Sequence, residues 1–391
     1  MQETKDIGLR GIPVADTKIC SIDGEKGKLI YRGYDIDELA QFSSFEETVY
    51  LLLYERLPTR KELELFKEEL ASHRKLPIGI IRHLKQRKKT ANPMDVLQSV
   101  IPMLADFDTG TRTGTKGTIM KQSLKLISKM STLVAYWDRI RKDLEIIEPD
   151  ESLSHAANFL YMINGKIPDE KTSRDFDICL IIHAEHSFNA STFSARVVAS
   201  TRAHIYACAG AAIAALSGEL HGGANTQVMN MLIEIDNIDN AEGWIRSKLD
   251  ANELIMGMGH AVYKTMDPRA RILSEISGRL AKRTGISKWY ELSLSIETLF
   301  RQEFKKRKGK EIYPNVDFYS PSVYYLMGIE PDLFTSIFAV SRISGWCAHI
   351  IEEKYAQAQP KPAIYRPEAD YIGNYCGIEG CKYVSIEKRI Q

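Results

Sequence analysis

The chain has 391 residues, of which 44% are hydrophobic and 26% charged, values typical of a globular protein with one large or two ordinary domains. Its 52 Lys and Arg residues almost balance its 51 Asp and Glu residues, so overall charge directs it to neither nucleic acid nor membrane. Any binding of anions must therefore depend on local clusters.

The start of the chain, its hydropathy and its cysteines predict a cytoplasmic location. The opening MQETKDIGLRG lacks the basic-then-apolar pattern of a signal peptide. The longest weakly polar stretch, 205–217, is shorter than the roughly 17 residues that a membrane span needs. Only Cys376 and Cys381 among the six cysteines lie close together, and CGIEGC does not have a zinc-site spacing. We therefore expect six free thiols in a reducing compartment.

The first predicted elements are two strands, 18–22 and 28–31, on either side of the turn signal Asp23-Gly24. The pairs Ser44/Glu47 and Thr59/Glu62 then match the capping box that begins a helix. Helical spacing of apolar residues continues over 93–108, 119–143, 151–163, 190–216, 224–235 and 269–284. Because no strands alternate with these helices, the fold class is mainly α.

Small residues and loops mark the remaining segments. The stretch 200–217 is rich in Ala and Gly, so we expect a helix that is deeply buried or lies at a subunit interface. The clearest loops are 108–118, 307–315 and 357–368. The run RQEFKKRKGK at 301–310 is strongly basic, and it could be a solvated loop or a phosphate contact.

Three short segments combine histidine with Gly or Asn: HAEHSFN at 183–189, GELHGGAN at 218–225 and GMGHAVYK at 257–264. Taken singly, such residues have structural explanations, because a histidine can be a core residue and Asp317 could cap a helix. Arg342 could likewise form a structural ion pair. The HAEH sequence also permits a metal-dependent hydrolase, because His183 and His186 could share a helix face with Glu185 beside them, although no third ligand is indicated nearby.

Together these segments resemble the citrate synthase family. The motifs HAEHSFNAST, GELHGGAN, GMGHAVYK with DPRA, PNVDFYS, IFAVSRISGW and YRPEADY follow the family's order, as do the opening IPVADTKICSIDG and RGYDIDEL. The resemblance runs from about residue 8 to 385, and the length is similar to the shorter, dimeric type. It implies a two-domain, mainly α fold with a short N-terminal β hairpin. A large domain for dimerisation would comprise 1–218 and 325–391, and a small domain for CoA binding would comprise 219–324.

The resemblance also implies roles for individual residues. Asp317 would remove a methyl proton from acetyl-CoA, His221 would hydrogen-bond the thioester oxygen as it becomes an enolate, and His260 would polarise the ketone of oxaloacetate. Oxaloacetate would be held by His186, Arg269, Arg342 and Arg366, the last contributed by the other subunit of a homodimer. CoA would be contacted by Lys264, Lys308 and Lys310 and by the loop containing Gly257, Gly259 and Val262.

These residue types suit a condensation without a metal or redox cofactor. A thioester α-proton is weakly acidic, so a carboxylate base needs a neutral donor that stabilises the enolate oxygen. The Gly-Gly-Ala-Asn after His221 resembles a helix start, which disfavours a charged imidazole. Three arginines and two histidines suit a dicarboxylate, because arginine binds a carboxylate through two parallel hydrogen bonds.

Four positions depart from the family's common pattern, and they bear on the acyl pocket and on CoA binding: Glu219, Met258, Ala261 and Pro321. The nearest alternative activity is that of a 2-methylcitrate synthase, which uses propionyl-CoA and shares every catalytic residue. One methylene in a pocket changes selectivity only about 10–200-fold, so the motifs leave this choice open.

Overall fold

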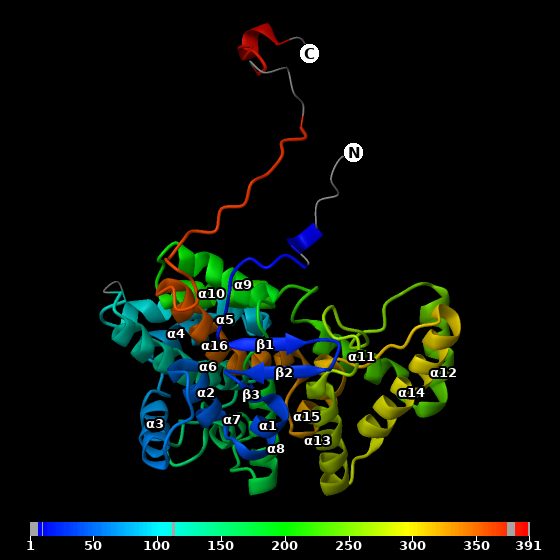
Figure 1. Ribbon diagram of the computed structural model, residues 1–391. Helices are drawn as coiled ribbons and strands as arrows, with labels where there is room; N and C mark the ends of the chain where they lie inside the picture. Colours follow the sequence, from blue (N-terminus) through cyan, green and yellow to red (C-terminus); the bar gives the residue numbers. More distant parts are fainter. Residues whose placement is uncertain (1–6, 10, 112–113, 374–379, 390–391) are drawn as a thin grey trace.

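The computed structural model describes residues 7–9, 11–111, 114–373 and 380–389, and these residues form a mainly helical fold (Figure 1). The strands are β1 (Cys20–Asp23), β2 (Lys28–Tyr31) and β3 (Tyr34–Asp35), joined in one antiparallel sheet in that order. The first helices are α1 (Ile36–Phe42), α2 (Phe45–Tyr54), α3 (Arg60–Ser72), α4 (Ile78–Gln86), α5 (Pro93–Met103), α6 (Lys116–Arg141), α7 (His155–Asn164) and α8 (Glu170–His183). They are followed by α9 (Ala190–Ser200), α10 (Ile205–Leu216), α11 (Ala224–Ile235), α12 (Ile238–Asp250), α13 (Pro268–Thr284), α14 (Lys288–Lys308), α15 (Val316–Leu326) and α16 (Phe334–Lys354). The predicted fold class, including the hairpin, is confirmed.

The N-terminal hairpin forms where the turn signal predicts it. Cys20 pairs with Tyr31 and Asp23 with Lys28, and the Asp23 carboxylate accepts hydrogen bonds from two backbone N–H groups in the turn. The first strand begins two residues later than predicted. The strand β3 was not predicted, because two residues are too few to show an alternating pattern.

Two predicted helical segments have different bounds in the structure. The segment predicted as 190–216 is broken into α9 and α10 by a turn in which Arg202 has φ 66° and His204 caps the next helix. The basic run is helical rather than a loop, since α14 continues to Lys308 before Gly309 ends it in a left-handed conformation. The capping box at Thr59 is complete, whereas at Ser44 the structure shows its side-chain half.

The core is built around α16, whose side chains are buried from Phe334 to Glu353. By length and composition Pro331–Lys354 could cross a membrane, but its most apolar 18-residue stretch is wholly buried inside the protein, as the core helix of a globular fold is. The α10 helix packs against α9 and α5, and a Cβ on Gly210 would lie 2.9 Å from Pro102. The predicted close approach of small residues is therefore present.

The cysteines only partly match the prediction. Cys20, Cys179, Cys208 and Cys347 are buried free thiols. Cys381 is disulfide-bonded, so the prediction of free thiols is wrong for this residue. Cys376 lies outside the described residues.

Helices α11, α12 and α14 lie together at one side of the molecule, with α13 and α15 between them and the rest (Figure 1). This arrangement accords with an inserted small domain, whose boundaries at 218/219 and 324/325 stay a prediction.

The hairpin turn docks on the loop that joins α12 to α13. The backbone N–H of Lys264 donates to the Gly24 carbonyl at 3.0 Å, and the Lys264 ammonium pairs with the Glu25 carboxylate. Position 24 has no room for a side chain, because a Cβ there would lie 2.2 Å from the Val262 carbonyl oxygen. The start of the chain therefore braces a loop of the segment 219–324.

Replacing Gly24 by Ala should push the hairpin off this loop, because a backbone oxygen cannot move aside as a flexible side chain can. We expect faster hydrogen exchange of the amides in 260–266 and a lower thermal midpoint. Gly243→Ala is the matched control, since Gly243 lies within α12 with open space around its Cβ position, and it should stabilise the helix by up to about 1 kcal/mol. Unchanged protection of 260–266 in Gly24→Ala would contradict the bracing role.

Candidate active site

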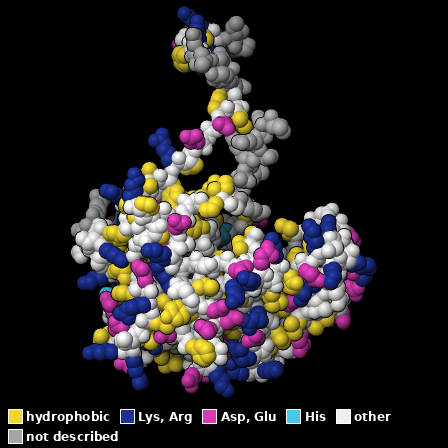
Figure 2. Space-filling model, viewed as in Figure 1, with side chains coloured by type: hydrophobic (Ala, Val, Ile, Leu, Met, Phe, Trp, Pro, Cys, Tyr) yellow, Lys and Arg dark blue, Asp and Glu magenta, His cyan; other side chains and the backbone are white. Residues whose placement is uncertain are grey.

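One cavity of about 610 Å³ is lined by residues from distant segments of the chain, between Ile22 and Arg342. Its lining includes seven of the site residues predicted from sequence: His186, His221, His260, Val262, Arg269, Asp317 and Arg342. The wall is completed mainly by apolar and small polar side chains, among them Ile22, Phe188, Leu220 and Phe338. The space-filling view shows the molecule hollowed between its main body and the lobe to the right (Figure 2).

His221 lies between α10 and α11, and one of its ring nitrogens accepts a hydrogen bond from the start of α9. The backbone N–H of Ser191, in the first turn of α9, donates to His221 Nε2 at 3.2 Å. A ring nitrogen that accepts carries no proton, so the neutral ring has its N–H at Nδ1. Burial, with a further contribution from Arg342, lowers the pKa of His221 to about 4. The predicted helix start after His221 is present, with α11 beginning at Ala224, but the hydrogen bond comes from α9.

His260 has the opposite tautomer. Its Nδ1 accepts from the backbone N–H groups of Val262 at 2.9 Å and Tyr263 at 3.2 Å, so the proton of the neutral ring is on Nε2. Burial and the nearby Arg269 lower the pKa of His260 to about 4. Both rings are therefore neutral donors at physiological pH, His221 through Nδ1 and His260 through Nε2.

Asp317 lies in the first turn of α15, where Asn315 caps the helix by accepting the Asp317 N–H at 2.9 Å. Asn315 also donates its side-chain amide to the Gly259 carbonyl at 2.8 Å, which ties this helix start to the His260 loop. Burial raises the pKa of Asp317 from its usual value to about 6, against the opposing effect of Arg269. A carboxyl group with this pKa is suited to a general base near neutral pH.

Arg342 brings an incompletely bonded guanidinium to the cavity. The side chain is 1% exposed, its Nε donates to the His183 carbonyl at 2.6 Å, and its plane lies over Phe338 at 4.6 Å. Within the described part of the chain its buried Nη2 has no hydrogen-bond partner. Burial lowers the pKa of Arg342 to about 10, so it remains charged at neutral pH. A buried donor of this kind is costly unless an anion binds it.

Two further residues predicted to hold oxaloacetate, Arg269 and His186, are also buried. Arg269 makes a bidentate pair with Asp267, at 3.0 and 2.7 Å, which orients the guanidinium in the first turn of α13. His186 lies 3.3 Å from the Tyr263 hydroxyl through Nε2, and its ring centre is 5.4 Å from that of His260. Burial, with Arg269 and Arg342 nearby, lowers the pKa of His186 well below its usual value.

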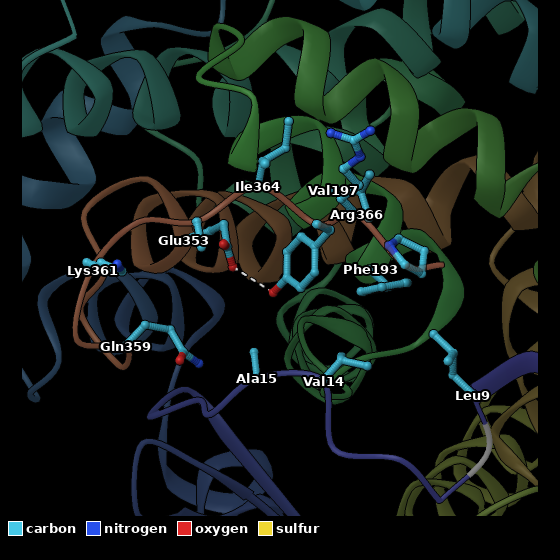
Figure 3. Close-up of a pocket in the computed structure, with 13 residues that line it drawn as sticks. Leu9, Val14, Ala15, Phe193, Val197, Glu353, Gln359, Lys361, Ile364 and Arg366 are labelled. Atoms are coloured by element: carbon cyan, nitrogen blue, oxygen red, sulfur yellow. Dashed lines mark hydrogen bonds between the residues drawn. The ribbon is translucent and has the colours of Figure 1, made fainter. Parts of the chain in front are cut away.

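Six predicted residues are not in the cavity lining. Arg366 lines a different cavity of about 500 Å³, with Phe193, Val197 and Glu353 (Figure 3). Lys264, Lys308 and Lys310 are exposed, and Lys264 is paired with Glu25. Gly257 and Gly259 have positive φ and pair through their backbone with residues 313–315. They thereby connect the His260 loop to the start of α15.

The HAEH side chains have separate partners. His183 Nδ1 contacts the Cys179 carbonyl at 2.7 Å, and Glu185 contacts His349 at 2.9 Å, while His186 lies beside Tyr263. Over the described ranges, no group of three or more His, Cys, Asp or Glu side chains is arranged to hold a metal ion. The geometry therefore does not favour the metal-dependent hydrolase.

Sequence reasoning missed several residues that orient the predicted ones. Ser191 donates to His221, Tyr263 contacts His186, and Asp267 holds Arg269. Only Asp267 had a local signal, since it stands two residues before Arg269 at a helix start. Ser191 is 30 residues distant from His221, so no single short motif contains both residues.

Comparison with known proteins gives a consistent result. The family model "Citrate synthase, C-terminal domain" matches residues 8–368. Citrate synthase 2 of Bacillus subtilis is 46% identical over 383 residues, 98% of each chain, and the citrate/2-methylcitrate synthase of the same organism is 37% identical over 367 residues, 94% of this chain and 96% of that one.

A solved structure shares the fold. It is the ternary complex of carboxymethyl coenzyme A and oxaloacetate with citrate synthase from the thermophilic archaeon Thermoplasma acidophilum. That protein is 32% identical, with a TM-score of 0.90, and the match covers 99% of this chain and 100% of the other. Because these matches extend over nearly the whole of each chain, the chain belongs to the citrate synthase family.

Proposed function

We propose that the cavity condenses oxaloacetate with the methyl carbon of acetyl-CoA and then hydrolyses the thioester to citrate and CoA. The observation that carries this proposal is the pair of neutral histidines with opposite tautomers, in one cavity with a carboxyl group of raised pKa. Such a set supplies one base and two separate donors, as an enolisation followed by attack on a ketone requires.

In the first step the Asp317 carboxylate removes a proton from the methyl group. His221 donates its Nδ1–H to the thioester oxygen, where the negative charge of the enolate develops. One such donor in a dry site is worth roughly 3–4 kcal/mol, and the base typically contributes a factor of 10²–10⁴. The enolate carbon then attacks the ketone carbon of oxaloacetate, whose C=O π bond breaks as the new C–C bond forms. The resulting alkoxide is hydrogen-bonded by His260 Nε2–H and becomes a hydroxyl by gaining one proton, which balances the proton taken by Asp317. Water cleaves the resulting thioester, releasing CoA and the new carboxylate.

Oxaloacetate binds through its two carboxylates in this proposal. Arg342 has an unused buried donor for one of them, and Arg269, oriented by Asp267, is placed for charge-assisted contacts. His186 is neutral and donates a hydrogen bond rather than a charge. Since every substrate charge has a basic or neutral donor partner, the reaction needs no metal or redox cofactor.

CoA would bind over the His260 loop. Val262 lines the cavity, and Ile312, two residues after Lys310, is 3.5 Å from the Cβ position of Gly259. Lys308, at the end of α14, and Lys310 are exposed just before this contact, and in this proposal their ammonium groups bind CoA phosphates. For Lys264, the pair with Glu25 must open before a phosphate can bind.

A homodimer in which Arg366 completes the partner's site is supported by the chain after α16. In Figure 1 this segment leaves the body on the side of α9 and α10 and extends away from it. Figure 2 shows hydrophobic side chains on the body close to where it departs. Several large apolar residues of the segment are exposed in one chain, including Ile364, Tyr371, Ile372 and Tyr383. A second copy would cover them.

The proposal is tested by thiol release from acetyl-CoA and from propionyl-CoA, with and without oxaloacetate, and with a chelator. We expect release that depends on oxaloacetate, is faster with acetyl-CoA and is unaffected by the chelator. Faster release with propionyl-CoA would favour the 2-methylcitrate synthase activity. Release from neither substrate would reject the proposed function, and loss in chelator that zinc restores would revive the metal hydrolase.

The pH dependence should report Asp317. Since its pKa is about 6 and the base must be ionised, kcat/KM should fall about tenfold for each pH unit below 6. His221 and His260, with pKa values near 4, remain neutral donors down to about pH 5 and do not cause this loss. A thermal midpoint measured across the same range separates titration from unfolding. A flat rate between pH 7 and 5 would contradict the assignment.

Two substitutions should separate the base from the carboxylate site. Asp317→Asn should lower kcat by about 10²–10⁴-fold and keep oxaloacetate affinity, whereas Arg342→Ala should weaken oxaloacetate binding by about 10–100-fold. The pKa of Asp317 is higher in the folded than in the unfolded protein, so stability falls as pH rises from about 4 to 6 and the folded protein must bury a charge. Asp317→Asn removes this charge and should therefore not lower the thermal midpoint at pH 7. Calorimetric titration with oxaloacetate checks both, and a large loss of affinity in Asp317→Asn would refute the base role.

Complementation should show whether Arg366 acts across subunits. Arg366→Ala and Asp317→Asn homodimers should each be nearly inactive, but in a mixed dimer one site collects both lesions and the other none. With statistical mixing half of the dimers are mixed, so co-expression should restore roughly a quarter of wild-type activity. No recovery despite demonstrated subunit exchange would place Arg366 in its own subunit's site or outside any site.

A further inference from the structure

A buried ionic network lies behind the cavity, outside the proposed chemistry. Arg196 of α9 is fully buried, and its guanidinium bonds His349 Nδ1 at 2.9 Å and Glu352 at 2.7 Å, with Glu353 paired at 2.7 Å. All three partners lie on α16. Buried charges are costly even when paired, so a network of this size calls for a role beyond stability.

The network sets the tautomer of His349. Arginine can only donate, so Nδ1 of His349 must accept and the ring proton is on Nε2. This nitrogen lies 2.9 Å from a carboxylate oxygen of Glu185 and donates to it. His349 therefore connects Arg196 to the Glu185 carboxylate through two hydrogen bonds, one at each ring nitrogen.

Glu185 is held by its backbone as well. The Tyr31 hydroxyl donates to the Glu185 carbonyl at 2.8 Å and accepts from the Glu185 N–H at 3.2 Å. Gly345 of α16 leaves just enough room, because a Cβ there would lie 2.3 Å from the Glu185 carboxylate. The next residue is His186, and Ser187 after it has φ 51°, a left-handed conformation that costs energy without glycine. The held Glu185 thus supports the strained turn that brings His186 to the cavity.

The other end of the network reaches the C-terminal segment. The Tyr365 hydroxyl donates to Glu353 at 3.0 Å, drawn as the dashed line in Figure 3, and Tyr365 precedes Arg366. Phe188, which lines the cavity, lies over the Arg196 guanidinium at 4.6 Å. The same arginine is therefore linked through Glu353 to Tyr365, beside Arg366, and directly contacts Phe188 in the cavity wall.

We propose that Glu185 and His349 are positioning residues for the oxaloacetate site, which orient the His186 turn and couple it to the placement of Tyr365 beside Arg366. This inference rests on the proposed function. Neither residue lines the cavity, and His349 acts on the turn through its hydrogen bond to Glu185.

The main test compares His349→Leu, which breaks both hydrogen bonds, with His349→Gln, whose amide oxygen can accept from Arg196 while its N–H donates to Glu185. His349→Leu should raise KM for oxaloacetate at least 10-fold with little change in KM for acetyl-CoA, and His349→Gln should remain within about threefold of the wild type. Asp138→Asn is the control, because Asp138 is an equally buried partner of Arg141 and Lys142 away from the cavity. It should lower the thermal midpoint without changing either KM. A His349→Leu enzyme that is less stable but has the wild-type KM for oxaloacetate would overturn the proposal.

The substitution Tyr365→Phe tests whether Tyr365 is coupled to the His186 turn through the network. It removes one hydroxyl from a partly exposed side chain. It should raise KM for oxaloacetate about threefold in the wild type and less than 1.5-fold in His349→Leu, since the relay is already broken there. Equal effects in both backgrounds would refute the coupling. If His349→Leu does not fold, Tyr365→Phe alone decides, and an unchanged KM overturns the coupling.

Failure of the proposed function would look different. A wild-type protein that neither binds oxaloacetate nor releases CoA rejects that function, while the positioning claim is still read by histidine NMR. The His186 ring resonances should shift in His349→Leu and not in Asp138→Asn. Unshifted His186 resonances in His349→Leu would overturn the positioning role whatever the reaction.

Discussion

Backbone N–H groups determine what the histidines of the cavity can do. Each of His221 and His260 has one ring nitrogen occupied by main-chain donors, which leaves a single N–H, on Nδ1 in one ring and on Nε2 in the other. A side chain could not hold a tautomer as firmly, because it could rotate or titrate. The first turn of α9 and the loop braced by the N-terminal hairpin are therefore structural requirements of the chemistry, and burial strengthens their effect by keeping both rings uncharged.

Much of this arrangement follows from short stretches of sequence. The turn signal at Asp23-Gly24 predicts the hairpin, and helical spacing predicts most of the helices. The candidate residues His186, His221, His260, Arg269, Asp317 and Arg342 all line one cavity. They could be selected from the sequence because each stands in a short motif that also matches the family. Such local signals can be recognised in the sequence without any knowledge of how the helices pack.

Other features depend on contacts that no local pattern encodes. The break between α9 and α10 has neither Gly nor Pro, and it is stabilised by the cap at His204. Arg366 resembles the other arginines in sequence, yet it lines a separate cavity because the chain after α16 leaves the body. The tautomers depend on Ser191 and on the fold of the His260 loop. The bond from Arg196 to His349 joins residues 153 apart, so it belongs to the tertiary structure alone.

The buried network joins residues that are far apart in the sequence, and this separation affects the order in which the protein can fold. The Lys18 N–H donates to Glu352, across 334 residues, and the hairpin that begins near Lys18 supports a loop beyond residue 260. Contacts of such high sequence separation form late, because closing a long loop costs entropy before any contact repays it. The cavity therefore cannot assemble on a nascent chain before α16 has been synthesised, because Phe338 and Arg342 of that helix line it.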